Sequence, residues 1–144
     1  MGRTGLLLVV VSIAVLAGCA AAPSTEPPAA ATPIPLDGTS WVAVSINDTN
    51  TVLGAMPTLA FDGDRVSGST GCNTFGGTVV SEADGRVRFV DVVMTEIACA
   101  DPIGAQEAAF LAILGAPAEL AVDEGMLFLT TASGRVTFEG RAGG

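Results

Sequence analysis

The sequence contains no histidine, lysine or tyrosine among its 144 residues. Without histidine, hydrolysis by a Ser-His-Asp triad is excluded. The six basic residues are all arginines and face fifteen aspartates and glutamates, for a formal net charge of −9. Such an acidic excess without a basic patch argues against nucleic acid and against anionic membrane surfaces as partners. No catalytic set can be assembled, so we expect a protein that is not an enzyme and has no cofactor.

Residues 1–19 have the pattern of a secretory signal. Arg3 supplies a positive charge, and Leu6 to Leu16 is an apolar stretch too short to cross a bilayer comfortably. The stretch ends in Leu16-Ala17-Gly18-Cys19, which resembles the bacterial lipobox, where the cysteine is lipidated and becomes the first residue of the mature protein. We therefore expect Cys19 to anchor the protein to the cell membrane on its extracytoplasmic side. The alternative is an ordinary cleaved signal peptide in which Cys19 is incidental.

Residues 20–35 are rich in proline and alanine and predict a linker rather than part of a core. At about 3 Å per residue in an extended polyproline-like conformation, the linker reaches up to roughly 50 Å from the lipid. Residues 36–141 then form a single predicted domain.

Two cysteines, Cys72 and Cys99, remain for the folded domain once Cys19 is assigned to the lipid. Outside the cytoplasm a disulfide between them is the default expectation. It would close a loop of about 28 residues, for which chain entropy predicts roughly 3.5 kcal/mol of stabilisation. The alternative is two separate thiols, one of them buried as a small apolar side chain.

Strand patterns alternate with turn residues throughout the predicted domain. We expect strands over residues 39–46, 56–61, 65–69, 78–80, 86–90, 118–122, 126–130 and 135–139, with 92–95 as strand or loop. Residues 68–77 are rich in glycine, and after the strand over 65–69 we expect a connection in which Gly71 and Asn73 suit positive φ and Phe75 packs inward. About eight short strands with one helix predict a mostly β, α+β fold, a small antiparallel β-barrel-like domain.

The one helix is predicted over residues 103–114, with Asp101 as N-cap and Pro102 at the first helical position. Its expected apolar stripe consists of Ile103, Phe110, Leu111 and Leu114. Glu107 falls on that same stripe, where a carboxylate needs solvent, an arginine or backbone donors. A structural role, bonded to an arginine or to the loop at 71–77, is the favoured interpretation. The alternative is an acid with a perturbed pKa in a binding pocket.

Several segments together resemble a known family, the META domain of the HslJ-type heat-shock lipoproteins. These segments are Trp41, Pro57 to Phe61, Val66 to Gly68, Gly71 to Gly77, Thr95 to Cys99, Glu107 to Phe110 to Leu114, and Leu127 to Leu129. The resemblance implies a compact β-barrel-like domain with one helix in a bacterial envelope, with heat-shock and secretion or motility associations rather than a reaction. The chain departs from the family in its acidity and its lack of tyrosine.

Other candidate sites are weaker. Asp62, Asp64, Asp123 and Glu124 lie at turns, and their spacing does not match an oxygen-rich calcium loop. The glycine-rich segment lacks the following lysine or helix start that a phosphate-binding loop uses. No pair of carboxylates stands out for glycoside chemistry. We therefore expect no metal site.

Three functions remain open on the sequence alone. The first is a non-enzymatic envelope lipoprotein that binds another protein or supports tolerance of envelope stress. The second is a small-molecule carrier with a cavity inside the barrel, which would need a volume near the usual 300–1,000 Å³. The third is an inhibitor of a cell-wall hydrolase, in which acidic loops would face a basic enzyme.

Overall fold

The computed structural model describes residues 35–141. The expected signal peptide, Cys19 and the expected linker up to residue 34 lie outside the described residues. Within residues 35–141 the chain forms one helix, α1 (Ile103–Leu114), and nine strands: β1 (Ser40–Ile46), β2 (Thr49–Asn50), β3 (Thr58–Asp62), β4 (Arg65–Ser69), β5 (Thr74–Ser81), β6 (Val87–Met94), β7 (Glu119–Asp123), β8 (Met126–Thr131) and β9 (Gly134–Gly140).

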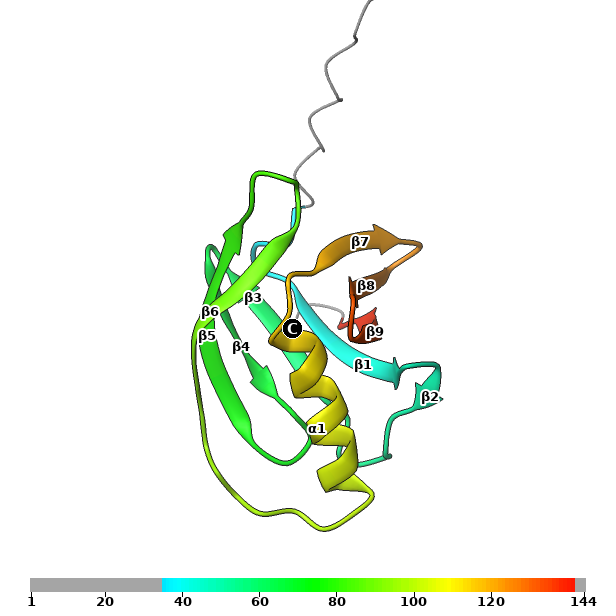
Figure 1. Cartoon of the computed structure of the whole chain (residues 1–144). Coiled ribbons are helices and arrows are strands. Elements are labelled where there is room, and N and C mark those ends of the chain that lie inside the picture. Colours follow the sequence, from blue (N-terminus) through cyan, green and yellow to red (C-terminus); the bar gives the residue numbers. More distant parts are fainter. Residues whose placement is uncertain (1–34, 142–144) are drawn as a thin grey trace, which may run out of the picture. The chain divides into compact units, whose positions relative to one another are not determined.

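All strand pairs in the sheet are antiparallel, and the strand order is β6-β5-β4-β3-β1-β9-β8-β7, with β2 added to the end of β1. Most neighbours are consecutive in the chain and are joined by tight turns. The two exceptions both involve β1, which pairs with β3 across the short β2 and with β9, joining the first strand of the domain to the last. This long-range pair connects the β3–β6 half of the sheet to the β7–β9 half (Figure 1).

The sheet curls until its two edges meet at one end. Val87 at the start of β6 and Ala118 just before β7 exchange two backbone hydrogen bonds of 2.8 Å each. Away from this bridge the edges separate, and α1 lies along the opening between the two halves (Figure 1). The prediction of a mostly β, antiparallel, barrel-like fold with one helix is confirmed, and the curled sheet is a half-barrel.

The interior between sheet and helix is filled by aromatic and branched side chains. Phe110 of α1 lies between Phe75 of β5, at 6.0 Å between ring centroids, and Phe138 of β9, at 6.4 Å. These three rings link both halves of the sheet to the helix, and all three are buried. Burying a large apolar side chain contributes about 1.5–3 kcal/mol, so this contact is a major source of stability.

The sequence-based boundaries are wrong in the glycine-rich segment. The strand expected over residues 65–69 is confirmed as β4, but β5 begins at Thr74 rather than near residue 78, so residues 74–77 lie in a strand and not in a connection. Only residues 70–73 form the turn, and of the two residues expected to suit positive φ, Gly71 adopts it and Asn73 does not. Gly68 lies inside β4, and the residue there is glycine because a Cβ would lie 2.0 Å from the carbonyl oxygen of Thr58 on β3. Close backbone approach, rather than turn geometry, therefore explains this glycine.

The helix spans the expected residues, but its start and its buried face differ in detail. The residue that precedes the first turn is Pro102, not Asp101, although the Asp101 carboxylate accepts a hydrogen bond from the Ala105 N–H at 3.0 Å. The buried residues are Phe110, Ile113 and Leu114. Ile113 was missing from the expected stripe, because a helix enclosed by both halves of a sheet buries a wider face than one stripe. Among the described residues, no helix has both the length and the apolar character needed to cross a membrane.

Candidate functional site

The turn between β4 and β5 is organised by the side chain of Thr70. Its hydroxyl accepts hydrogen bonds from the backbone N–H of Asn73 at 2.8 Å and of Cys72 at 3.2 Å. The Thr70 N–H donates to the Asn73 carbonyl at 2.8 Å. Gly71 has φ +93°, a conformation that favours glycine, and a Cβ there would meet the Ala55 carbonyl oxygen at 2.1 Å. Thr70 is fully buried, so the turn is part of the interior rather than a surface loop.

Asn73 connects this turn to the segment that follows β6. Its Oδ1 accepts from the Thr95 hydroxyl at 2.8 Å and from the Ile97 N–H at 2.7 Å. Its Nδ2 donates to the Ile97 carbonyl at 3.0 Å and to Glu107 Oε1 at 2.9 Å. The side chain is 3% exposed. A buried amide with both donors and two acceptor positions occupied fixes two chain segments and the helix relative to one another.

Glu107 lies against the turn, as the structural interpretation expected. Its Oε1 accepts from the Thr70 hydroxyl at 2.5 Å and from Asn73 Nδ2. In the described part of the chain, the ion pairs join other residues, and none includes Glu107. The carboxylate is therefore held by hydroxyl and amide donors from residues 70 and 73, not by an arginine.

A disulfide joins Cys72 and Cys99, whose Cα atoms are 6.2 Å apart, within the usual range for such bonds. It lies next to the Asn73 bonds and ties the same two chain segments together. We call Thr70, Cys72, Asn73, Cys99 and Glu107 the polar lock. Its thiols are oxidised and its carboxylate is hydrogen-bonded, so the arrangement suits holding structure better than nucleophilic or acid–base chemistry.

Sequence reasoning missed a second attachment of the helix. Gln106 Oε1 accepts from the Val52 N–H and its Nε2 donates to the Ala55 carbonyl, both at 2.7 Å. The loop between β2 and β3 is thereby held against the first turns of α1. Neighbouring Gln106 and Glu107 thus bind two different loops. A Gln-Glu pair near the start of a helix is too common to have predicted this.

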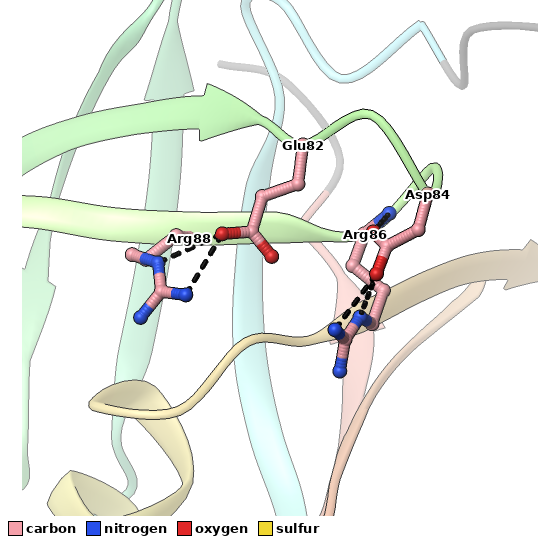
Figure 2. Close-up of polar contacts among 4 residues, drawn as sticks. All are labelled: Glu82, Asp84, Arg86 and Arg88. Carbon is pink, nitrogen blue, oxygen red and sulfur yellow. Dashed lines mark hydrogen bonds and ion pairs between the residues drawn. The ribbon is translucent and has the colours of Figure 1, made fainter.

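The charged residues of the β5–β6 turn pair with one another (Figure 2). Arg88 contacts Glu82 at 2.8 Å, and Arg86 contacts Asp84 at 2.7 Å. The hydrogen bond from the Arg86 side chain lowers the pKa of Asp84, and that carboxylate in turn raises the pKa of Arg86. These pairs are solvent-exposed, so they stabilise the turn only weakly.

The acidic turn residues do not converge. Asp62 and Asp64 flank Gly63 in the β3–β4 turn, whereas Asp123 and Glu124 lie in the β7–β8 turn, where Glu124 has φ +48°. Across residues 35–141, no three His, Cys, Asp or Glu side chains are grouped so that they could hold a metal ion.

A hollow of 610 Å³ lies on the outer face of the β3–β6 half, a feature the sequence did not predict. We call it the outer groove. Its lining comes from all four strands and includes Ala60, Asp62, Arg65, Ser67, Gly76, Gly77, Thr78, Asp91 and Val93. Its floor is the reverse side of the sheet from the filled interior, so it is separate from the barrel cavity that a carrier was expected to have.

Comparison with protein-family models matches residues 34–142 to the family described as META domain. An NMR structure is similar to this chain with a TM-score of 0.61 and 24% sequence identity, over 72% of this chain and 90% of the other. An NMR structure of a protein from Burkholderia xenovorans is similar with a TM-score of 0.58 and 26% identity, over 85% of this chain and 98% of the other. Comparison with curated proteins gives no match. The two structures support the fold and carry no statement of activity.

Proposed function

The chain belongs to the META domain family, and from that premise we propose that it is a non-enzymatic lipoprotein of the bacterial envelope whose domain binds another protein. The domain would be held outside the cytoplasm by a lipid on Cys19 and displayed on the linker of residues 20–35. A role in tolerance of envelope stress would act through that partner.

The observation that carries the proposal is a set of exposed apolar side chains at the β6 edge. Val92, Val93, Met94 and Ile97 are 40, 72, 38 and 61% exposed. We call these four residues the apolar strip. Val93 pairs with Gly76 and Met94 with the buried Phe75, so exposed apolar side chains lie on both faces of this edge. Exposed apolar side chains gathered at one edge are typical of protein contact sites. β6 is also an edge strand of the sheet, so its outer backbone groups are open to a partner along most of its length.

The polar lock supports a binding role over a catalytic one. Cys72, Cys99 and Glu107 are the residues of the lock that could do chemistry. The two cysteines are bonded to each other, and Glu107 accepts hydrogen bonds from the Thr70 hydroxyl and the Asn73 amide. The lock also fixes Ile97, since Asn73 bonds both its N–H and its carbonyl. The apolar strip is therefore presented on a rigid support, which lowers the entropic cost of binding.

A capture experiment tests the protein contact. The purified protein is immobilised and exposed to envelope extract, in parallel with the variants Val93→Ser and Ile97→Ser. We expect a partner that binds the wild type and is lost in both variants. Val122→Ser is the matched control, because Val122 is also exposed (42%) but lies on β7 at the other end of the strand order. A partner retained by both strip variants, or no partner at all, contradicts the proposal.

The lipid anchor is tested separately. We expect labelled fatty acid to be incorporated into the wild type but not into Cys19→Ala, and the variant to leave the membrane fraction. Incorporation that persists in Cys19→Ala, or none in the wild type, would refute the anchor while leaving the protein contact standing.

The net charge of −9 favours one specific class of partner, a basic enzyme of the cell wall. We therefore include a basic muramidase such as lysozyme as a bait and measure its activity with the protein added. Inhibition that weakens steeply with salt would identify the protein as a hydrolase inhibitor. Unchanged activity would remove this candidate.

A further inference from the structure

The outer groove exists because small residues lie side by side across the strands. Ala60 on β3 pairs with Ser67 on β4, Ser67 pairs with Gly76 on β5, and Gly76 pairs with Val93 on β6. Directly opposed residues on neighbouring strands project from the same face. Three small positions in succession thus leave a trough that runs across the sheet and ends at Val93.

Gly76 is a glycine that the fold itself does not require. Its φ is not in the left-handed region, and an added Cβ would have no neighbour closer than 3.7 Å, to the Val66 carbonyl oxygen. By contrast, Gly68 and Gly77 would meet backbone oxygens at 2.0 and 3.0 Å. Glycine inside a strand is unfavourable, because it loses more conformational entropy and packs no side chain. What Gly76 provides is the open floor of the groove.

Asp91, in the groove wall, adopts a backbone conformation that side chains rarely take. Its φ is +52°, and it lies where the pairing of β5 with β6 shifts between Gly76 and Thr78. Such a bulge redirects a side chain, and bulges are frequent next to functional sites. A strained non-glycine residue costs of order 1 kcal/mol and persists where the surrounding structure enforces it. Here the consequence is that a carboxylate lines the groove.

The opposite charge comes from Arg65 on β4. Its cross-strand neighbour on β5 is Thr78, and Ser67 is two residues away on the same face of β4. A guanidinium with two neighbouring hydroxyls is a donor set suited to a carboxylate. Among the ion pairs of residues 35–141, none includes Arg65. Its directly opposed residue on β3 is Asp62, which does not form an ion pair with it, so the guanidinium has a carboxylate beside it but remains open to a ligand.

Arg65 and Asp91 belong to strands separated by β5. Two strand spacings place their backbones about 10 Å apart. An extended chain advances about 3.3–3.6 Å per residue, so three residues cover the same distance. We propose that the outer groove binds a short peptide of about three residues with free termini, lying across the strands, with its carboxylate at Arg65, Ser67 and Thr78 and its ammonium group at Asp91.

The domain's charge favours a zwitterion over a simple anion. With a net charge of −9 the chain repels anions, and Asp62 adds a second carboxylate to the groove lining. A zwitterion presents its ammonium group to Asp91, while Arg65, which lies opposite Asp62 on β3, receives its carboxylate. The volume of 610 Å³ lies within the range of small-molecule sites. Val93 belongs to both the apolar strip and the groove lining, but Arg65 and Asp91 belong only to the groove, so variants at these two charged residues test this inference apart from the proposed protein contact.

The experiment is a titration of the purified full-length protein with trialanine at low ionic strength, followed by amide NMR shifts and calorimetry. The comparison ligand is N-acetyl-trialanine amide, which has the same shape without terminal charges. We expect trialanine to bind at millimolar or lower concentration, to shift the amides of Ser67, Gly76 and Thr78, and to bind at least about tenfold more tightly than the blocked peptide.

Three variants locate the site. Gly76→Val fills the floor, Arg65→Gln removes the cation, and Asp91→Asn removes the anion with a residue that also tolerates positive φ. Each is expected to weaken trialanine binding about tenfold or more. Arg88→Gln is the matched control, since Arg88 is an arginine of the same half-sheet that pairs with Glu82 and does not line the groove; its affinity should stay within about twofold of the wild type.

Four results would overturn the proposal: no shifts with trialanine at millimolar concentration, equal binding of the blocked peptide, shifts confined to residues outside the groove, or unchanged affinity in both Arg65→Gln and Asp91→Asn. These two charge variants replace exposed side chains and are expected to keep the fold, so the test does not depend on how Gly76→Val folds. Capture of a partner by the apolar strip is measured separately and can succeed or fail without affecting this result.

Discussion

The contact between Asn73 and Glu107 gives the most direct test of the polar lock. In Glu107→Leu the Thr70 hydroxyl keeps only a longer acceptor, the Asn73 carbonyl at 3.3 Å, and Asn73 Nδ2 loses one of its partners. A hydrogen bond to a charged group contributes about 1.5–3 kcal/mol, and Glu107 is half-buried, so we expect a loss of about 2 kcal/mol. For a domain of this size that corresponds to a melting temperature roughly 10 °C lower.

Asn73→Ala removes the four hydrogen bonds between Asn73 and its partners at residues 95, 97 and 107. Thr95 and Ile97 are exposed, so water replaces part of what they lose, and we expect a cost of about 3 kcal/mol. If the direct bond to Glu107 is worth about 1.5 kcal/mol, the double variant should lose about 3.5 kcal/mol rather than about 5 kcal/mol.

Urea unfolding with the disulfide intact measures all four members of the cycle. Trp41 is 6% exposed and is the only tryptophan, so its fluorescence reports the transition. Glu107→Gln is the control, because it keeps an acceptor oxygen at the same place and should cost at most about 1 kcal/mol. Additivity within about 0.5 kcal/mol, or a Glu107→Leu variant as stable as the wild type, would refute the structural role assigned to Glu107.

Three further results are expected. Replacing Cys72 and Cys99 together by serine should lower the free energy of unfolding by about 3 kcal/mol, measured in urea, and a reductant should then have no further effect. Gly71→Ala should lower the free energy of unfolding by more than about 2 kcal/mol, because a Cβ there meets a backbone carbonyl oxygen at 2.1 Å. Gly85→Ala, with φ +83° and open space around it, should lower it by about 1 kcal/mol, and equal losses in the two variants would contradict this reasoning. NMR titration of Asp84 should give a pKa below the ordinary aspartate value. Its ion pair therefore stabilises the fold at pH values above the unfolded-state pKa, and this contribution is lost as the pH falls through the folded-state pKa. Replacing Arg86, the partner of Asp84, should restore the ordinary pKa.

Local chemistry was sufficient to predict several elements. The helix bounds followed from Asp101-Pro102 at the start and Gly115 at the end, and the β3–β4 hairpin followed from Asp62-Gly63. The pairing of Cys72 with Cys99 followed from counting cysteines. In each case a residue type has a strong conformational or chemical preference that acts over a few neighbours, so a single sequence reveals it.

The features that were missed depend on neighbours far apart in the chain. Gly76 and Gly77 look like loop residues, yet they lie in β5, because their surroundings come from adjacent strands rather than from their own propensity. The outer groove is a further case. Small residues at positions 60, 67 and 76 become a trough only when the register of β3, β4 and β5 is known.

The position of the polar lock links the two surfaces for which roles are proposed. β5 starts directly after Asn73 and contributes Gly76 and Thr78 to the outer groove, while Asn73 also bonds both backbone groups of Ile97 in the apolar strip. A change in the polar lock therefore affects both the outer groove, through the start of β5, and the apolar strip, through Ile97. We expect reduction of the disulfide to weaken partner capture by the strip more than trialanine binding in the groove. The groove residues lie in strands that stay paired, whereas Ile97 of the strip lies outside β6 and would be held mainly by its hydrogen bonds to Asn73. Equal losses at both surfaces would instead indicate that the whole half-sheet depends on the disulfide.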